Sequence, residues 1–482
     1  MKTNGVLMAV SSLPGEYGIG DFGEGVIQFI DYLKEAGIKI WQILPLNPLG
    51  SGNSPYQSEC SFAIDPIYID LDALSSEGLI LSFELPDNVS TDHVNYAEVR
   101  KIKNKILMDA FLNDERRNSK ALLDFVKDNK WLDAYAKYSI LKSKNGFKPW
   151  FKWNDEDKNA YYHEFELKEE KVIYDFICWE QFIAYKQFQK VKKYANSRGV
   201  KIFGDLPFYV GTDSSDVWAN QDEFQFDSDG DPLGVAGCPP DYFSKDGQRW
   251  GNYLYDWDYM KDDGYTFWLS RFKKAQELFV ITRIDHFRAF DTYYSINPEC
   301  PTAVDGVWKN GPGSNFLDVL FKKMPNINIV AEDLGYLAPS VHVLRDKYNL
   351  MGTNVFQFTI FDKTFLTRVN QVIYTGTHDN QTLKGWLKSL NGKDTELLNI
   401  LFARDNIKGR NLRDKVFNYI MGSPCEMAII PIQDYLNLDD KARMNTPGTS
   451  NWDINWTFKL KDYSAFADKI DKIAALIKKY KR

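Results

Sequence analysis

The chain has 482 residues, of which 44% are hydrophobic and 26% charged, the values of a globular protein with a large buried core. Its net charge of −7 at pH 7 provides no broad basic surface, so we expect no nucleic-acid partner. The five cysteines are scattered and never occur in Cys-x-x-Cys spacing, which argues against a disulfide framework and against a structural zinc site.

The N-terminal segment contains one short apolar run, Gly5–Val10. A run of about six residues is too short for the apolar core of a signal peptide, and no later segment approaches the ~20 apolar residues that span a membrane. We therefore expect a cytoplasmic protein with no membrane partner.

The first elements along the chain form a strand–helix–strand unit. Val6–Val10 predicts a buried strand, and apolar residues from Phe22 to Leu33 recur at helical spacing until Gly37 ends the helix. Ile38–Leu46 predicts a second apolar strand. Strand, helix and strand in this order form a βαβ unit, which implies parallel pairing of the two strands.

Further short apolar runs bring the expected number of strands to eight, and several are followed by a helical pattern. These runs are Val200–Leu206, Val280–Ile284, Ile327–Ala331, Asn354–Phe358, Val372–Tyr374 and Met427–Ile432. Eight strands with interspersed helices favour a (β/α)8 barrel over an open sheet, forming one catalytic domain over residues 1–482. The closing helix is expected from Phe466 to Ile477.

Two connections are longer than ordinary loops of such a barrel. Residues 50–197 separate the second and third strands, and their Lys-, Glu- and Leu-rich middle predicts a mainly helical insertion. Residues 211–259 separate the third and fourth strands and are rich in Gly, Pro, Asp and aromatic residues. We expect this second insertion to be irregular and to bind substrate.

Carboxylates occur where four of the expected strands end: Asp205, Asp285, Glu332 and Asp379. In (β/α)8 barrels, the C-terminal strand ends and the loops after them build the active site. The positions of these four residues therefore predict an active site at one end of the barrel.

The segment Thr282–Arg288 contains the first candidate for chemistry. Arg283 precedes Asp285 by two residues, so both side chains lie on the same side of the strand. A nearby permanent cation keeps a carboxylate ionised, as a nucleophile requires. The alternative interpretation is a purely structural Arg–Asp pair.

Two further segments carry candidate residues. Glu332 follows an apolar strand, where desolvation can raise the pKa of a carboxyl toward that of a general acid. In Thr375–Asn380, a turn of small residues presents His378 and Asp379. A histidine paired with a carboxylate can bind neighbouring sugar hydroxyls through charge-assisted hydrogen bonds.

The sequence contains no His-x-x-x-His pair, no cysteine cluster and no EF-hand loop, so we expect no required metal. It also lacks the glycine-rich loops that bind nucleotide phosphates. We therefore expect no cofactor.

Taken together, the motifs resemble those of the amylomaltases, the disproportionating enzymes of glycoside hydrolase family 77. Besides the segments above, the resemblance rests on Asn53-Ser-Pro-Tyr-Gln57, Gly204-Asp-Leu-Pro-Phe208, Pro239-Pro-Asp-Tyr-Phe243, Gly247-Gln-Arg-Trp-Gly-Asn252 and Arg443-Met-Asn-Thr-Pro447. It runs in the family's order from about Ser11 to Trp456. After Thr449 the spacing differs from that of the family, so that Asn451-Trp452 and Asn455-Trp456 both match its Asn-Trp pair.

The resemblance implies a role for each matching residue. Asp285 would be the nucleophile, Glu332 the general acid and base, and Asp379 the carboxylate that stabilises the transition state. The residues expected to bind or support the glucan are Arg283, His286, His378, Tyr56, Ser54, Gln248, Trp250, Asn445 and, behind the centre, Asp205.

The resemblance further implies a 4-α-glucanotransferase. Such an enzyme transfers α-1,4-glucan segments from a maltooligosaccharide to the 4-hydroxyl of glucose or of another glucan, with retention of configuration. Retention requires the Asp285 and Glu332 carboxyls to lie about 5 to 5.5 Å apart. The alternatives are an α-amylase-type hydrolase on the same barrel and a catalytically inactive glucan-binding protein.

Overall fold

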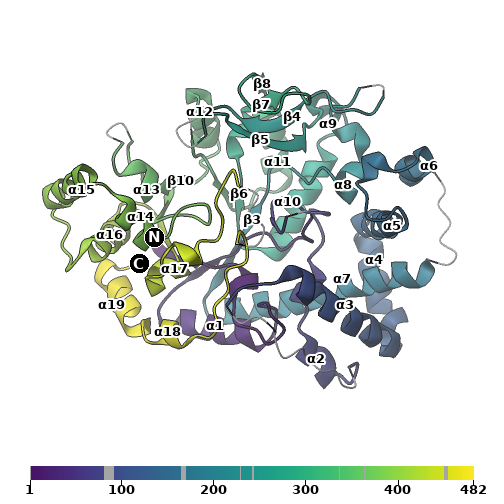
Figure 1. Ribbon diagram of the computed structural model, residues 1–482, viewed down its shortest axis with the longest axis horizontal. Helices are drawn as coiled ribbons and strands as arrows, with labels where there is room; N and C mark the ends of the chain where they lie inside the picture. Colours follow the sequence, from purple (N-terminus) through teal and green to yellow (C-terminus); the bar gives the residue numbers. More distant parts are fainter. Residues whose placement is uncertain are drawn as a thin grey trace.

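Eight short apolar segments of the chain form one parallel sheet in the computed structural model (Figure 1). The structure describes every residue except 1, 51, 81–88, 90–91, 164–169, 228, 241–243, 336, 363–364 and 450–453. In spatial order the strands are β10 (Gly352–Val355), β11 (Gln371–Tyr374), β12 (Met427–Pro431), β1 (Thr3–Leu7), β2 (Ile40–Gln42), β3 (Lys201–Leu206), β6 (Ile281–Ile284) and β9 (Ile329–Ala331).

The sheet curves until its two edge strands meet. Val330 of β9 forms a parallel bridge with Met351, which directly precedes β10, and the Ala331 N–H donates to the Met351 carbonyl at 2.8 Å. The strands are almost entirely buried, as expected when helices cover one face and the barrel core fills the other. The predicted (β/α)8 barrel is confirmed, and each expected apolar run contains or overlaps a barrel strand.

Helices surround the barrel. Those that directly precede a barrel strand include α1 (Glu24–Glu35), α7 (Lys171–Ser197), α10 (Thr266–Leu278), α11 (Gly313–Lys323), α12 (Pro339–Lys347) and α16 (Leu412–Gly422). The last helix of the chain is α19 (Ile470–Tyr480). In α1 the buried residues are Val26, Phe29, Ile30 and Leu33, whose spacing makes one apolar stripe along the helix.

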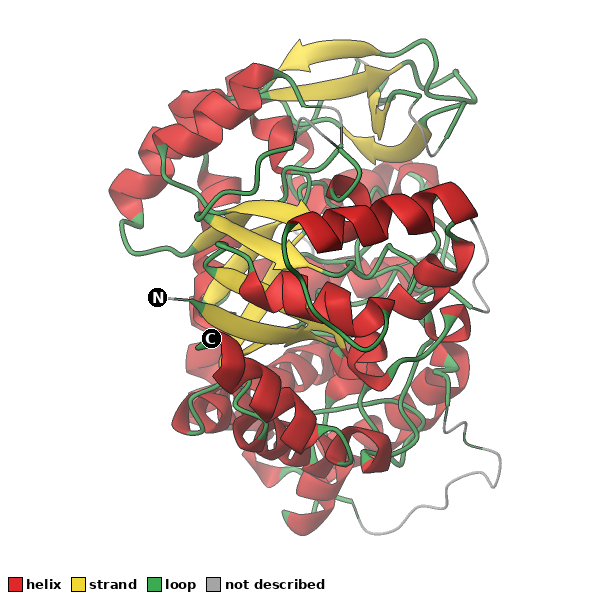
Figure 2. Cartoon of the chain, turned by 90° about the vertical axis from the view of Figure 1, so that its left-hand side faces the viewer, coloured by secondary structure: helices red, strands yellow, loops and turns green. Residues whose placement is uncertain are grey.

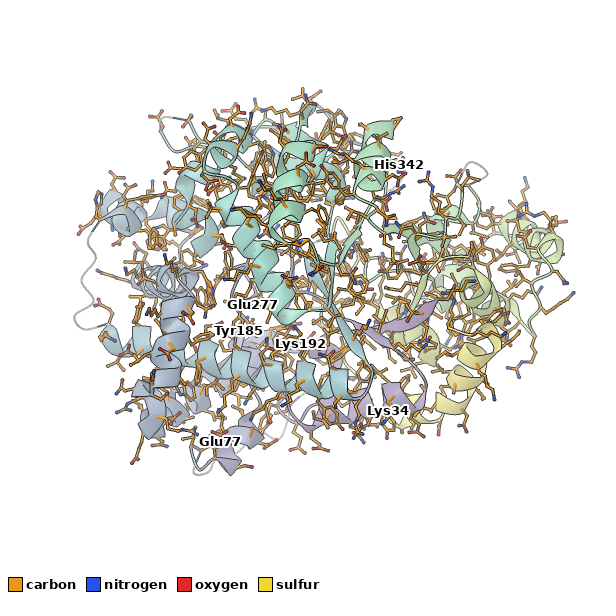
Figure 3. The ribbon with its side chains drawn as sticks, turned by 180° about the vertical axis from the view of Figure 1, so that it is seen from behind. Lys34, Glu77, Tyr185, Lys192, Glu277 and His342 are labelled. Atoms are coloured by element: carbon orange, nitrogen blue, oxygen red, sulfur yellow. The ribbon has the colours of Figure 1, made fainter. Side chains whose placement is uncertain are left out.

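The connection between β2 and β3 contains several helices that stand beside the barrel, at the right of Figure 1. They are α2 (Leu71–Ser76), α3 (Tyr96–Asn113), α4 (Lys120–Asp128), α5 (Trp131–Lys144), α6 (Asp155–Asn159) and α7. Figure 3 shows Tyr185 and Lys192 of α7 beside Glu277 of α10. The Lys192 ammonium donates to the Glu277 carbonyl at 2.6 Å, so α7 joins these helices to the barrel.

A second, smaller sheet lies above the barrel in Figures 1 and 2. Its antiparallel strands, in spatial order, are β5 (Gln248–Tyr253), β4 (Val235–Cys238), β7 (Thr292–Ile296) and β8 (Val307–Asn310). The connection after β3 supplies β4 and β5, while the connection after β6 supplies β7 and β8. This sheet was not expected from the sequence, because β4 is short and contains Gly237, and β5 begins with two polar residues.

The remaining helices lie between β10 and the C-terminus, apart from α8 (Ser215–Trp218) and α9 (Trp257–Asp262). They are α13 (Phe356–Thr359), α14 (Leu383–Ser389), α15 (Gly392–Arg404), α17 (Ile432–Leu436) and α18 (Ser464–Ala467). The chain ends meet: the Arg482 guanidinium donates to the Thr3 carbonyl at 3.1 Å (Figure 1). In the part of the chain that the structure describes, no helix is both long and apolar enough to cross a membrane.

Gly204 of β3 packs closely against the ring of Phe279, the residue that follows α10. A Cβ at Gly204 would lie 2.2 Å from the Phe279 ring, so a methyl group there requires the buried ring to move. We expect Gly204→Ala to destabilise the fold by about 1–3 kcal/mol, measured by chemical unfolding. Gly392→Ala in α15 is the control, because its methyl group meets no atom within 4 Å. Equal unfolding midpoints for the two variants would contradict the packing.

Candidate active site

The four predicted carboxylates lie at the C-terminal ends of barrel strands. Asp205 is the fifth residue of β3, Asp285 directly follows β6, and Glu332 directly follows β9. Asp379 lies in the turn after β11. This is the end of the barrel at which enzymes of this architecture place their active sites.

Arg283 is the cation at the centre of the site. Its guanidinium contacts Asp205 at 2.5 Å and Asp285 at 2.9 Å. The Tyr56 hydroxyl donates to the same Asp205 oxygen at 2.8 Å. Because the Asp205 side chain is fully buried, it supports Arg283 from behind, whereas the Asp285 side chain is 29% exposed.

The charge state of Asp285 differs from the expectation that Arg283 keeps it ionised. Burial raises the pKa of Asp285 to about 7, although Arg283 opposes the rise. The nearby negative charges of Asp205 and Glu332 add to the rise. Burial is the main cause, and the Asp205 carboxylate, which also contacts Arg283, offsets part of the stabilisation that the guanidinium gives to ionised Asp285.

Glu332 is held in place by two backbone groups. The His286 N–H donates to one carboxylate oxygen at 2.8 Å, and the Leu334 N–H donates to the other at 2.9 Å. His286 adopts the left-handed backbone conformation, with a φ of 52°. Such a conformation costs energy in a residue with a side chain. This backbone conformation directs the His286 N–H toward the Glu332 carboxylate.

Asp379 and His378 form an ion pair. The His378 Nε2 lies 3.3 Å from one Asp379 oxygen, and the Asn445 amide donates to the other at 2.7 Å. Burial alone would raise the pKa of Asp379, but His378 and Asn445 outweigh it and lower the pKa to about 2. Burial likewise opposes the charge on His378, yet Asp379 raises the pKa of that imidazole.

Aromatic rings line both sides of the carboxylates. On one side, Trp250 of β5 contacts the His286 ring edge-on, with the centroids 4.8 Å apart, and the Trp250 indole N–H donates to Gln248 at 3.2 Å. On the other side, Tyr56 stacks on His378 with centroids 5.2 Å apart. The Ser54 hydroxyl accepts the Tyr56 N–H at 3.3 Å, which shapes the turn that presents the tyrosine.

All twelve predicted residues thus lie in or directly behind this group. Three more that were not predicted also contact it. Tyr209 lies near the rings of Trp250 and His286, Arg443 donates to the Asp379 carbonyl at 2.6 Å, and Trp456 packs on Tyr56 and His378. Arg443 and Tyr209 lie in or next to motifs noted in the sequence. Trp456 belongs to one of the two Asn-Trp pairs; the other, Asn451-Trp452, lies outside the described residues.

Histidine, cysteine and carboxylate side chains of the described residues form no group of three that could hold a metal ion. The chemistry of the described group is that of two carboxylates on neighbouring strands with a third, ionised carboxylate nearby. Such a set can attack, protonate and stabilise a cationic centre at a sugar carbon.

Comparison with known proteins gives one consistent result. The sequence model of the 4-alpha-glucanotransferase family matches residues 8–465. The 4-alpha-glucanotransferase of Clostridium butyricum is 37% identical over 489 residues, which cover 98% of this chain and 100% of that protein. The enzyme of the same name from Aquifex aeolicus is 37% identical over 486 residues, which cover 99% of each protein.

Solved structures agree with the sequences. The amylomaltase from Streptococcus agalactiae in complex with acarbose superposes with a TM-score of 0.91 at 31% identity, covering 100% of both chains. The amylomaltase from Corynebacterium glutamicum superposes with a TM-score of 0.78 at 17% identity, covering 100% of this chain and 75% of that one. The second likeness concerns the fold alone.

The sharing of Arg283 between two carboxylates leads to a prediction. We expect Asp205→Asn to lower the pKa of Asp285, because the variant removes a like charge and leaves Arg283 to Asp285 alone. The measurement is a pH titration of ¹³C-labelled aspartate carboxyls by NMR, with the Asp285 signal assigned by its loss in Asp285→Asn.

The pair of Asp65, which is fully buried, and Arg100, whose side chain is 33% exposed, provides the control, with a shortest contact of 2.6 Å. Asp65→Asn also removes a buried carboxylate from an arginine, but it should leave the titration of Asp285 unchanged. An unchanged or higher pKa of Asp285 in Asp205→Asn would contradict the shared-cation account.

Proposed function

The chain belongs to the 4-alpha-glucanotransferase family, glycoside hydrolase family 77, and from this membership we propose how its barrel residues perform the family's reaction. The protein transfers segments of α-1,4-glucan and acts on maltooligosaccharides. Glucose is proposed as a second acceptor beside the glucans, through its 4-hydroxyl, and the cytoplasm as the location.

The reaction is a double displacement at the anomeric carbon. In the first step an Asp285 oxygen bonds to that carbon, the glycosidic bond breaks, and Glu332 gives its proton to the departing oxygen. In the second step Glu332 takes the proton of an acceptor 4-hydroxyl, whose oxygen bonds to the carbon as the bond to Asp285 breaks. Two inversions retain the α configuration, and no cofactor enters either step.

The observation that carries this proposal is the link between the two carboxylates. Asp285 and Glu332 follow the adjacent strands β6 and β9, whose axes run about 4.8 Å apart. The N–H of His286, the residue after Asp285, donates to the Glu332 carboxylate at 2.8 Å. Both facts support the separation of about 5 to 5.5 Å that a retaining enzyme needs, rather than the ~6.5–9.5 Å of an inverting one.

The raised pKa of Asp285 suits a group that must leave again. A carboxylate of very low pKa is a weak nucleophile, whereas one that is partly desolvated attacks more readily. As the bond to the sugar forms, Asp285 loses its negative charge. Asp205 then remains as the charged partner of Arg283. The second displacement restores the charge and the shared contact.

Asp379 is proposed to bind the 2- and 3-hydroxyls of the reacting sugar. Its pKa of about 2 keeps it ionised at neutral pH, and His378 adds a donor beside it. Hydrogen bonds to these hydroxyls strengthen as positive charge develops on the ring, so they stabilise the transition state more than the bound substrate.

The aromatic side of the site bears on the choice between transfer and hydrolysis. Trp250 and Tyr209 pack with the ring of His286, the residue after Asp285, and the three form an aromatic wall. We propose that a bound acceptor sugar packs against this wall. A sugar in that position excludes the water that would otherwise hydrolyse the intermediate.

Incubation with maltotriose alone tests the function. A transferase gives a ladder of shorter and longer maltooligosaccharides, while a hydrolase gives glucose and maltose without longer products. Intact maltotriose, with binding but no products, would indicate a glucan-binding protein. Only the ladder is compatible with the proposal.

We expect Glu332→Gln to lose about 10²- to 10⁴-fold in the rate of transfer from maltotriose, because the amide cannot supply the proton. A maltosyl fluoride needs no protonation of its leaving group and should still react with Asp285. The fluoride is therefore the internal control for folding and for nucleophilic attack. Near wild-type rates with maltotriose would refute the assignment of Glu332.

We expect Trp250→Ala to increase the ratio of hydrolysis to transfer, because water then reaches the intermediate beside His286. The measurement is the release of glucose relative to longer oligomers from maltotriose. Trp308→Ala is the matched control, since Trp308 is a half-exposed indole at the opposite edge of the same small sheet. If the ratio of hydrolysis to transfer is the same in both variants and in the wild type, Trp250 does not exclude water from the intermediate.

A further inference from the structure

Three aromatic rings enclose the turn that carries Asp379. His378 stacks on Tyr56 at 5.2 Å with an interplanar angle of 20°. Trp456 packs on both, with its centroid 5.7 Å from the His378 ring and 5.7 Å from the Tyr56 ring. The three rings therefore form a triangular cluster in which each contacts the other two, and Tyr56 and Trp456 come from distant parts of the chain.

Trp456 is held in an unfavourable backbone conformation. Its φ is 69°, in the left-handed region that bulky residues rarely adopt. The Trp456 N–H donates to the Met444 carbonyl at 2.6 Å, and the Trp456 carbonyl accepts the Tyr96 hydroxyl at 2.9 Å. Strained residues of this kind persist where the surroundings fix them, and they cluster at functional sites. The chain that carries Trp456, yellow in Figure 1, passes across the barrel between α17 and α18.

The electrostatic surroundings of His378 are mixed. Asp379 lies 3.3 Å away, and its charge favours the imidazolium. Asp205 also favours it, while burial and the positive charge of Arg283 oppose it. Asp285 lies near enough to interact with the same ring.

Arg443, which donates to the Asp379 carbonyl, adds a second positive charge near His378, whereas the two rings that pack on the imidazole carry no charge. Burial raises the pKa of Tyr56 well above its usual range, so this ring stays neutral. Trp456 does not titrate. The electron-rich face of Tyr56, on which the imidazole stacks, attracts a cation, and so does the tilted Trp456 ring, whose centroid is 5.7 Å away; this attraction grows when water is excluded.

We propose that Trp456 is a positioning residue which, with Tyr56, holds His378 as an imidazolium against Asp379. The inference rests on the proposed function, in which Asp379 must stay ionised while it binds the sugar hydroxyls. The imidazolium supplies the positive charge that keeps it so. Trp456 is only 6% exposed, so it acts through the imidazole rather than on the sugar.

The test compares Trp456→Leu with Trp456→Phe. Leucine fills part of the space but has no aromatic face, whereas phenylalanine keeps one. We expect the pKa of His378 in Trp456→Leu to fall by about 0.5–1 pH units, the effect of losing one partly buried cation–π contact, and to change much less in Trp456→Phe.

The first readout is the ¹⁵N and ¹³C NMR titration of the histidines without substrate. The chain has five histidines, so the His378 signal can be assigned by its loss in His378→Gln. Trp131→Leu, which removes an indole stacked on Phe62 at 6.1 Å, is the control and should leave His378 unchanged. If Trp456→Leu does not fold, Tyr96→Phe replaces it, because it removes the hydroxyl that donates to the Trp456 carbonyl.

The second readout is the pH dependence of kcat/KM for disproportionation of maltotriose. Because His378 must be protonated, activity is lost as the pH rises through its pKa, so the alkaline limb should move to lower pH in Trp456→Leu. An unchanged His378 pKa in that variant overturns the inference whatever the activity. A shifted His378 pKa in Trp456→Leu without a shift of the alkaline limb also overturns the inference. If the wild type does not disproportionate maltotriose, the proposed function is overturned instead.

Discussion

The site depends on one buried cation that has two anionic partners. Arg283 connects Asp205, which is sealed in the barrel, to Asp285, which reaches the open end. A buried arginine with a single partner would either hold that partner too tightly for catalysis or be left unpaired when the partner reacts. Sharing avoids both, because Asp205 keeps Arg283 neutralised while Asp285 changes its charge.

The rest of the molecule places other groups around this pair. The eight strands bring the carboxylates to one end of the barrel, and the long connections bring the aromatic residues. Tyr56 comes from the connection after β2 and Trp250 from the connection after β3. Trp456 comes from the segment that follows α17. Rings from three separate connections therefore enclose a charge arrangement that the strands alone create.

The strands and the carboxylates could be predicted from the sequence because both are local signals. A buried parallel strand is a short apolar run, and a carboxylate directly after it lies at the barrel end. The small sheet could not be predicted in this way, since β4 and β7 are separated by the 53 residues 239–291 and contain little apolar alternation. Trp456 was missed for a related reason: its contacts with Tyr56 and His378 join residues that are far apart in the chain. The contact of Arg283 with Asp205, which places a second negative charge near Asp285, also follows only from the folded geometry.

The small sheet is built from two connections, and this limits how the enzyme can be altered. Strands β4 and β5 come from one connection and β7 and β8 from the other, and β4 pairs directly with β7. Strand β7 begins seven residues after Asp285, so a change in either connection is transmitted to the turn that aims His286 at Glu332. Chimeras made to alter acceptor choice must therefore exchange both connections together, as a single interlocked module, because a graft of one alone would carry half of a sheet.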